Sequence, residues 1–419
     1  MTEGKIVVGV DIGTSKIVSL IARVDEENVN VLGVHEVPSA GMRKGQIVDI
    51  EQVVLAINSS LEGAERMAGF SASHVIASIG GSHIESQNSR GVVAVSHPDE
   101  EITEGDLARV LEAAKAVSLP SSREIIHVLP RSYIVDGQEG IKAPLGMTGV
   151  RLEVDTHIIS AYNISVRNLE KAFSEVGVDV DAVVFSGLAS SLATLSDTEK
   201  ELGVVLVDIG AGTTDIAVYV DGSLAYSSVL PVGARHITND LAIGLRISLE
   251  SAEKIKLLLS SGKVARKEEG KDEIDLTSLN LPEDLTKVSE KTLIDGIIKP
   301  RLNEIFTFVG LEIKKSGFGG QTPSGLVVTG GGALTTGVAE TAKRMLAMPV
   351  RIGKPVNIKG IIDEIQGPSF STAVGLAVYG RDIDMESGLP FGFQIPQVSI
   401  GKLNKPVARI IDFVKSFMP

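Results

Sequence analysis

The 419-residue chain contains no cysteine and no tryptophan, and aromatic residues make up only 4% of it. The absence of cysteine excludes disulfide bonds, thiol catalysis and cysteine-ligated zinc. The seven histidines are scattered without metal-ligand spacing, which favours ordinary core or surface roles. Few aromatic residues and a formal net charge of −13 argue against broad nucleic-acid binding, which requires a basic surface and stacking side chains. We therefore expect no nucleic-acid partner.

Long uncharged apolar runs are also missing. The longest, from Ala182 to Ser196, contains several serines and falls short of the roughly 20 residues that a membrane span requires. The N-terminal residues enter a predicted strand directly, without the basic segment and apolar core of a signal peptide. We expect a cytoplasmic protein of two or more domains, whose 43% hydrophobic residues can build substantial cores.

The chain does contain a repeated turn, in which an aspartate precedes glycine and hydroxyl residues between two β-rich runs. The copies comprise Asp11, Gly13, Thr14 and Ser15, and Asp208, Gly210, Ala211, Gly212, Thr213 and Thr214. Glycines let backbone N–H groups approach phosphate oxygens, hydroxyls add donors, and a carboxylate at a strand end can hold Mg²⁺ through its waters. The repetition predicts a phosphate pocket in which Asp11 and Asp208 position Mg²⁺, although either turn alone is equally typical of a tight hairpin.

Two other phosphate-binding motifs are disfavoured. Gly210-x-Gly212 is part of a dinucleotide fingerprint, but that fingerprint needs a helix after the glycines, and here Ile216–Val220 predicts a strand. The chain has no Gly-x₄-Gly-Lys-[Ser/Thr] run, which excludes a P-loop.

A third glycine run follows the predicted strand Leu326–Thr329 and precedes the predicted helix Val338–Met345. It consists of Gly330, Gly331, Gly332 and Ala333. Such a turn can seat a flat base or its ribose, and a simple strand-to-helix connection is the alternative. In this order the three runs resemble the phosphate 1, phosphate 2 and adenosine motifs of the actin, Hsp70 and sugar kinase superfamily. That resemblance implies a two-lobed α/β ATPase fold with ATP and Mg²⁺ between the lobes.

Three further side chains are candidates for the same site. Glu253 and Lys256 lie three residues apart on the predicted helix Ile247–Leu259 and therefore share one face. They form either a surface ion pair or, as the superfamily implies, contacts to ribose and adenine. Lys16 follows the first turn and is a candidate for a phosphate contact.

Residues 87–162 read as an inserted α+β module. Its predicted helix, Asp106–Val117, has Thr103 as N-cap and Asp106 in the capping-box position, and strands precede and follow it. A second insertion contains a charged run that starts at Gly262 and a predicted helix, Leu293–Lys314, with a kink or boundary near Pro300.

The end of the chain has a different character. After Arg381, prolines and glycines indicate a linker, and residues 405–419 then follow helical spacing. The apolar face of this predicted helix comprises Val407, Ile410, Ile411, Val414, Phe417 and Met418. Docking on the protein's own core is one interpretation, but the linker and the local basic charge favour an anionic membrane surface. One such tail binds modestly, and several tails on one oligomer bind more firmly.

With the motifs, module and tail together, the chain resembles the FtsA family, actin-like cell-division proteins that tether FtsZ to the membrane. The most specific stretches are Gly41–Asp49, Gln138–Gly146, Phe185–Ser191 and Asp208–Val218. The resemblance implies that the module is subdomain 1C, which replaces subdomain 1B and makes head-to-tail filament contacts. It also implies a peripheral location on the cytoplasmic face of the membrane at the division site, with other division proteins as further partners.

The same resemblance places the C-terminal peptide of FtsZ on subdomain 2B. Arg301 and Glu304 match the family's positions for that contact, and an ordinary i,i+3 ion pair is the alternative. The implied subdomains are 1A (1–86, 163–200 and 367–382), 1C (87–162), 2A (201–244 and 316–366) and 2B (245–315), followed by a linker (383–404) and the membrane helix (405–419).

One position departs from the superfamily pattern. Ser186 stands where other members carry a glutamine or glutamate that handles the attacking water, and a serine is a weak group for that task. Asp208 remains a weak catalytic candidate through the metal's water, so we expect at most a slow or regulatory ATPase. Two alternatives share the nucleotide motifs: a metabolite kinase, and a pilus-assembly relative of FtsA.

Overall fold

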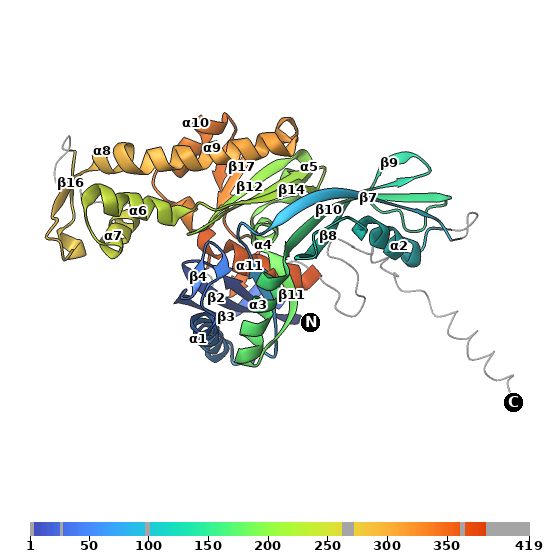
Figure 1. Cartoon of the computed structure of the whole chain (residues 1–419), viewed down its shortest axis with the longest axis horizontal. Coiled ribbons are helices and arrows are strands. Elements are labelled where there is room, and N and C mark those ends of the chain that lie inside the picture. The colour runs from blue at the N-terminus through green and yellow to red at the C-terminus, as the bar shows by residue number, and fades with distance from the viewer. Residues whose placement is uncertain (1–3, 26–27, 97–100, 262–271, 361–364, 383–419) are drawn as a thin grey trace.

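The computed structural model describes residues 4–25, 28–96, 101–261, 272–360 and 365–382 (Figure 1). The predicted linker and membrane helix, and all but the last two residues of the charged run, lie outside these ranges. Within them, three sheets organise the molecule, each with its own set of helices. No helix in the described part is long and apolar enough to span a bilayer.

The first sheet has six strands in the order β11-β6-β1-β2-β3-β19. Their bounds are β1 Lys5–Ile12, β2 Lys16–Val24, β3 Val29–Pro38, β6 His74–Ile79, β11 Asp179–Phe185 and β19 Ile358–Gly360. Helices α1 (Ile50–Ala68) and α3 (Asn163–Val176) pack together against it, as do α4 (Ser186–Thr194) and α11 (Ser371–Asp382). A short hairpin, β4 (Met42–Arg43) and β5 (Gln46–Ile47), precedes α1.

The second sheet has five strands in the order β14-β13-β12-β17-β18. Their bounds are β12 Val204–Ile209, β13 Thr214–Val220, β14 Ser223–Leu230, β17 Leu326–Thr329 and β18 Val350–Ile352. Every residue of β12 and β13 is buried, as expected for central strands covered on both faces. The helices of this lobe are α5 (Asp197–Leu202), α6 (Ala234–Leu245), α7 (Leu249–Ser260), α8 (Glu290–Leu293), α9 (Lys299–Ser316) and α10 (Val338–Leu346).

The helices of the second insertion differ in part from those predicted. The predicted break near Pro300 is confirmed, because the π-helical turn η2 (Ile294–Ile298) separates α8 from α9 and Pro300 stands in the first turn of α9. Helix α7 begins at Leu249, two residues later than predicted, because Ser248 caps it. The strands β15 (Glu273–Asp275) and β16 (Lys287–Ser289) form a small sheet beside these helices, and η1 (Thr277–Leu279) lies between them. The other 3₁₀ turns are η3 (Gly319–Gln321), η4 (Gly331–Leu334) and η5 (Pro368–Phe370).

The third sheet belongs to the inserted module and has the order β7-β10-β8-β9. Its strands are β7 Glu85–Ala94, β8 Arg123–Val135, β9 Gln138–Ile141 and β10 Arg151–Tyr162, with α2 (Glu104–Lys115) packed on them. The predicted capping box is confirmed: Thr103 and Asp106 satisfy each other's backbone N–H groups at the start of α2. A separate cluster of buried apolar residues fills the space between helix and sheet, which confirms a compact α+β unit.

Side chains connect the module to the edge of the second sheet. Ser86 Oγ on β7 donates to the Ser227 carbonyl on β14 at 2.6 Å, and Asn88 Nδ2 donates to the Ala225 carbonyl at 3.2 Å. His157 lies between them, with Nδ1 2.7 Å from Asn88 Oδ1 and Nε2 2.9 Å from Ser227 Oγ. Burial lowers the pKa of His157 to about 3, so the ring is neutral and has the structural role expected of the histidines.

Candidate functional site

The first glycine turn joins two fully paired strands. Asp11 stands opposite Val18 at the end of the β1–β2 ladder, and the Gly13 amide closes the turn by donating to the Lys16 carbonyl at 3.1 Å. Ser78, on the neighbouring strand β6, donates its hydroxyl to Asp11 Oδ1 at 2.8 Å and accepts from the Ile12 amide at 2.9 Å. Two strands therefore orient the carboxylate of Asp11.

The second turn repeats this geometry in the other lobe. Asp208 stands directly opposite Asp215 in the β12–β13 ladder, and the Gly210 amide donates to the Thr213 carbonyl at 2.9 Å. Thr214 is fully buried, and its hydroxyl donates to the Val232 carbonyl at 2.8 Å. This hydroxyl therefore holds the turn against the segment that leads into α6.

The two turns meet. A methyl group on Gly212 would lie 2.9 Å from Oγ1 of Thr14, so the glycine is what allows the second turn to approach the first so closely. Thr14 Oγ1 also accepts a hydrogen bond from the Gly45 amide at 3.1 Å, which ties the β4–β5 hairpin to the same place. The structure thus brings together the two predicted phosphate loops from separate lobes.

The third glycine run joins the second turn through the sheet. Strand β17 runs parallel to β12 with Thr329 beside Asp208, and Gly330 follows with a φ of +81°. A side chain at position 330 would overlap the carboxylate of Asp208. Gly331, Gly332 and Ala333 then form the 3₁₀ turn η4 (Gly331–Leu334) that leads to α10. The third motif therefore meets the second at the Asp208 carboxylate, and the first meets the second at Thr14 and Gly212.

Glu253 and Lys256 form the ion pair that their spacing allows. Lys256 Nζ lies 2.8 Å from Glu253 Oε2, and the hydroxyl of Thr238 on α6 contacts both groups, at 2.9 and 2.5 Å. The Thr336 hydroxyl donates to the Leu259 carbonyl at 2.8 Å, so the end of α7 lies against the segment that follows η4. The pair therefore stands on a helix that adjoins the third glycine motif.

Three carboxylates lie close together where the lobes meet, and burial is the main cause of the raised pKa of each. Burial raises the pKa of Asp11, and burial together with the charge of Asp11 raises the pKa of Asp208 to about 7. Burial and the charges of Asp208 and Asp11 raise the pKa of Asp215 well above its ordinary value. Mutual repulsion of this kind favours a bound cation. Among the described residues no three acidic, histidine or cysteine side chains form a metal site on their own.

Asp215 is the residue that the sequence analysis missed. It is buried, and its Oδ1 has no hydrogen-bond partner among the described residues. A methyl group built on Gly80 would lie 3.2 Å from the Ser186 hydroxyl and 3.8 Å from Asp215 Oδ2, so both side chains flank this glycine. The register of the second turn, with four residues between strands, places Asp215 on the same face as Asp208 and was a readable signal.

Lys16 contacts two other side chains in the structure. Its ammonium lies 2.6 Å from Glu36 Oε2 and 3.8 Å from the centroid of the Phe370 ring. A phosphate contact by Lys16 therefore requires the side chain to exchange Glu36 for the ligand.

Arg301 forms more than the expected i,i+3 pair. Its Nε and Nη2 donate to the two carboxylate oxygens of Asp240 on α6 at 2.6 and 2.9 Å, and its Nη1 donates to Glu304. The hydrogen bond to Asp240 raises the pKa of Arg301 further. Phe308 and Leu311, about two and three turns beyond Arg301 on α9, are 39% and 57% exposed. A fixed guanidinium group thus stands near an apolar surface on one helix.

Comparison with known proteins agrees with this geometry. Residues 81–160 match the model of the SHS2 domain inserted in FTSA, and residues 205–375 match that of the cell division protein FtsA. The cell division protein FtsA of Pseudomonas aeruginosa is 39% identical over 381 residues, which cover 90% of each chain. The chain belongs to the FtsA family. FtsA of Bacillus subtilis is 37% identical over 96% of this chain and 90% of its own.

Solved structures give the fold. A PilM-PilN type IV pilus biogenesis complex has a TM-score of 0.63 at 16% identity, covering 90% of this chain and 99% of the matched chain. MreB5 of Spiroplasma citri, bound to ADP, has a TM-score of 0.51 at 14% identity, covering 90% and 95%. At such identities the likeness shows the fold alone. The predicted actin-like α/β architecture with its inserted module is therefore confirmed.

Proposed function

We propose that this FtsA-family chain is an ATP-binding, actin-like protein that polymerises on the cytoplasmic face of the membrane and tethers FtsZ to it. The observation that carries the nucleotide part is the meeting of the three glycine turns, the first with the second at Thr14 and Gly212 and the third with the second at Asp208. The first two turns touch at Thr14 and Gly212, so a phosphate chain held by the backbone N–H groups of one turn would lie beside those of the other.

Each group of residues is assigned to one part of the nucleotide or to its metal. In this proposal Gly13, Thr14, Ser15 and Lys16 hold phosphate from one lobe, and Gly210, Ala211, Gly212, Thr213 and Thr214 from the other. Gly330, Gly331, Gly332 and Ala333 hold the adenosine, with Glu253 and Lys256 toward the ribose and adenine. Asp11 and Asp208 hold Mg²⁺ through its waters. The cation would neutralise phosphate charge, and in binding it would keep both carboxylates ionised.

Hydrolysis is a secondary activity in this account. A serine hydroxyl such as that of Ser186 is a poor base, and Asp208 acts in this proposal through the metal's water. Asp215 is a further carboxylate beside Ser186, and burial together with the charges of Asp208 and Asp11 raises its pKa well above the ordinary value. We therefore describe the protein as a nucleotide-dependent scaffold first and as a slow or regulatory ATPase second.

The partner surface is proposed on α9. Arg301 is held in place by Asp240, so a carboxylate of FtsZ's acidic C-terminal peptide would meet a positioned guanidinium and would compete with Glu304 for it. The exposed side chains of Phe308 and Leu311 would pack against apolar residues of the peptide.

The remaining steps concern assembly. Subdomain 1C, proposed as residues 87–162, would make the head-to-tail contacts of a filament, and the helix at 405–419 would insert its apolar face into anionic lipid. Because each tail binds modestly, the number of tails on a filament would control how long the assembly stays on the membrane.

Co-sedimentation of FtsZ with anionic lipid vesicles tests the whole proposal. FtsZ should pellet with vesicles when this chain and ATP are present and should stay in solution when the chain is omitted. A metabolite kinase of the same fold would leave FtsZ in solution, and a pilus-assembly relative would bind neither FtsZ nor vesicles.

A further inference from the structure

Helix α6 begins directly on the second glycine turn. The backbone N–H of Ala234, the first residue of the helix, donates to the Gly210 carbonyl at 2.9 Å. The N–H of the next residue, Arg235, donates to the Ala211 carbonyl, also at 2.9 Å. The first N–H groups of a helix have no partner inside it, and here the turn supplies one. A methyl group on Gly233 would lie 2.5 Å from the Gly210 carbonyl oxygen, so a glycine is needed for this close approach.

This attachment sets the direction of the N–H groups that the turn offers to phosphate. In a trans peptide unit the C=O and N–H bonds point in opposite directions. Because the carbonyls of Gly210 and Ala211 point toward α6, the N–H groups of Ala211 and Gly212 point away from it. A phosphate oxygen bound to these N–H groups would polarise the same peptide units and thereby strengthen their hydrogen bonds to α6. Phosphate in the cleft would thus hold the start of α6 more firmly on the turn.

The same helix carries Asp240, which holds the proposed partner surface. Asp240 follows Ala234 by six residues, about 9 Å along the helix axis. Its two carboxylate oxygens accept hydrogen bonds from Nε and Nη2 of Arg301 on α9, at 2.6 and 2.9 Å. Such a bidentate pair fixes the plane of the guanidinium group as well as its position. The orientation of Arg301 therefore depends on where α6 lies.

Helix α6 also contacts the adenosine side of the proposed nucleotide site. The Thr238 hydroxyl donates to Glu253 Oε2 at 2.5 Å and accepts from Lys256 Nζ at 2.9 Å. Ile237 and Leu241 are buried in the core of the second lobe, and packed helices of this kind shift as units by small sliding movements. A displacement of α6 at either end of the nucleotide would therefore reach Asp240.

We propose that α6 couples the nucleotide cleft to the partner surface. This coupling rests on the ATP and peptide sites proposed above and adds their regulation. With ATP bound, α6 is fixed on the turn and Asp240 keeps Arg301 oriented, so less side-chain freedom is lost when the acidic peptide of FtsZ binds. ATP therefore raises the affinity for the peptide. Because coupling between two sites is reciprocal, the peptide raises the affinity for ATP by the same factor, about fivefold or more.

Fluorescence anisotropy of a labelled FtsZ C-terminal peptide on the full-length chain, without lipid, tests the coupling. The peptide should bind about fivefold more tightly with Mg²⁺ and a saturating non-hydrolysable ATP analogue than without nucleotide. Asp240→Asn keeps the shape of the side chain but removes the charge that holds Arg301, so the effect of nucleotide should fall below about twofold. Its affinity for ATP without peptide, measured by calorimetry, should match that of the wild type.

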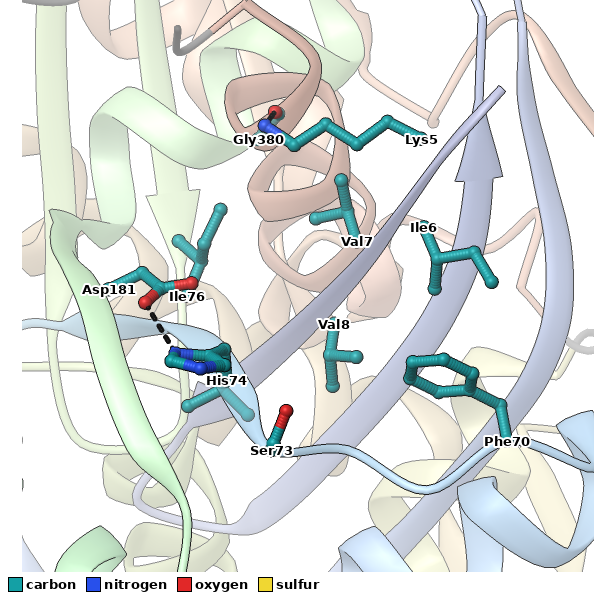
Figure 2. A pocket seen from close by; sticks show the side chains of 11 residues that line it. Lys5, Ile6, Val7, Val8, Phe70, Ser73, His74, Ile76, Asp181 and Gly380 are labelled. Carbon is teal, nitrogen blue, oxygen red and sulfur yellow. Dashed lines mark hydrogen bonds and ion pairs between the residues drawn. The ribbon is translucent and has the colours of Figure 1, made fainter. Parts of the chain in front are cut away.

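Asp181→Asn is the matched control. The side chains of Asp181 and Asp240 are 24% and 27% exposed, and each contacts a nitrogen-bearing side chain of another strand or helix. Figure 2 shows Asp181 beside His74, whose Nδ1 is 2.9 Å from Asp181 Oδ1, at a cavity of about 340 Å³ along β1 and β6. The variant removes the same kind of carboxylate from the first sheet, so it should keep the full effect of nucleotide on peptide affinity.

Hydrogen exchange gives a second readout that needs no variant. Peptide added without nucleotide should slow exchange of the Ala234 and Arg235 amides about threefold or more, because a peptide bound at Arg301 fixes α6 on the turn. Equal peptide affinity with and without nucleotide, undiminished coupling in Asp240→Asn, or unchanged exchange of the two amides would overturn the coupling and leave both binding sites standing. A chain that binds no peptide under either condition would refute the proposed partner site, and the coupling with it.

Discussion

Gly330 lies so close to Asp208 that a methyl group on the glycine would overlap the aspartate's carboxylate. The contact follows from the parallel pairing of β12 with β17, which sets Thr329 beside Asp208 and turns the chain at the next residue. The positive φ of Gly330 is also one that side chains rarely adopt. One glycine thus joins the adenosine motif to the proposed metal ligand.

Gly330→Ala should lower the affinity for ATP by more than backbone strain alone explains. With φ +81° and ψ 169°, Gly330 lies in a backbone region that is essentially restricted to glycine, so the alanine costs about 1–3 kcal/mol and also displaces the Asp208 carboxylate, and ATP affinity should fall at least tenfold. Gly337→Ala is the control for an alanine at positive φ, because Gly337 has a φ of +82° in the left-handed conformation and nothing near its added Cβ. Calorimetry should show near wild-type ATP affinity for Gly337→Ala; equal losses in both variants would refute the contact argument.

The stability of the nucleotide-free protein should fall between pH 5.5 and 8 partly because of Asp208. Burial raises the pKa of this carboxyl from 3.8 to about 7, so the folded state binds a proton that the unfolded state has released. This contribution is complete below pH 4 and is lost as the pH rises through 7. Asp208→Asn should therefore flatten the decline of Tm over this interval in thermal melts. A decline as steep as that of the wild type would show that Asp208 is already ionised at pH 5.5.

Arg301→Glu should weaken the binding of FtsZ's C-terminal peptide at least tenfold in fluorescence anisotropy. A charge-assisted hydrogen bond contributes about 1.5–3 kcal/mol, and the substitution also sets a carboxylate beside Asp240 and Glu304. ATP affinity should not change. Lys315→Glu, a charge reversal at an exposed position of the same helix, is the control. Peptide affinity that survives Arg301→Glu would mean that FtsZ binds elsewhere.

Ile411→Asp should abolish sedimentation with anionic vesicles, because it places a charge in the middle of the predicted apolar face. Ser416→Asp adds the same charge on the predicted polar face and should sediment with most of its wild-type affinity. Both variants should keep the wild-type Tm. A large drop in Tm for Ile411→Asp would instead indicate that the tail packs on the protein's core.

Local sequence signals predicted the elements that depend on local chemistry. Both glycine turns, the strand before Gly330 and the capping box at Thr103 occur as expected, because turn and cap residues act over a few neighbours. Helix α6 was missed, since its N-cap is Gly233, which has no side chain to mark the start. Helix α1 was also missed, although Asp49 caps its start and Gly69 ends it in the left-handed conformation, both readable signals.

Contacts between segments that lie far apart in the sequence could not be predicted from it. Asp240, 61 residues before Arg301, shares no local pattern with it, yet it binds the guanidinium through two hydrogen bonds. Lys16 likewise pairs with Glu36 because β2 and β3 form an antiparallel ladder. Such pairings depend on how elements pack, and they decide which charges remain available to a ligand.

The central claim, a cleft in which Asp208 holds Mg²⁺ for the nucleotide, is tested most directly by calorimetry of ATP at pH 8, with Mg²⁺ and with EDTA. Asp208→Asn keeps the shape of the side chain but removes its charge, and Asp221→Asn, in the β13–β14 turn, is the control. We predict that Asp208→Asn lowers ATP affinity at least tenfold in Mg²⁺ and leaves it unchanged in EDTA, whereas Asp221→Asn has no effect in either. An Asp208→Asn protein that gains as much affinity from Mg²⁺ as the wild type would contradict the account.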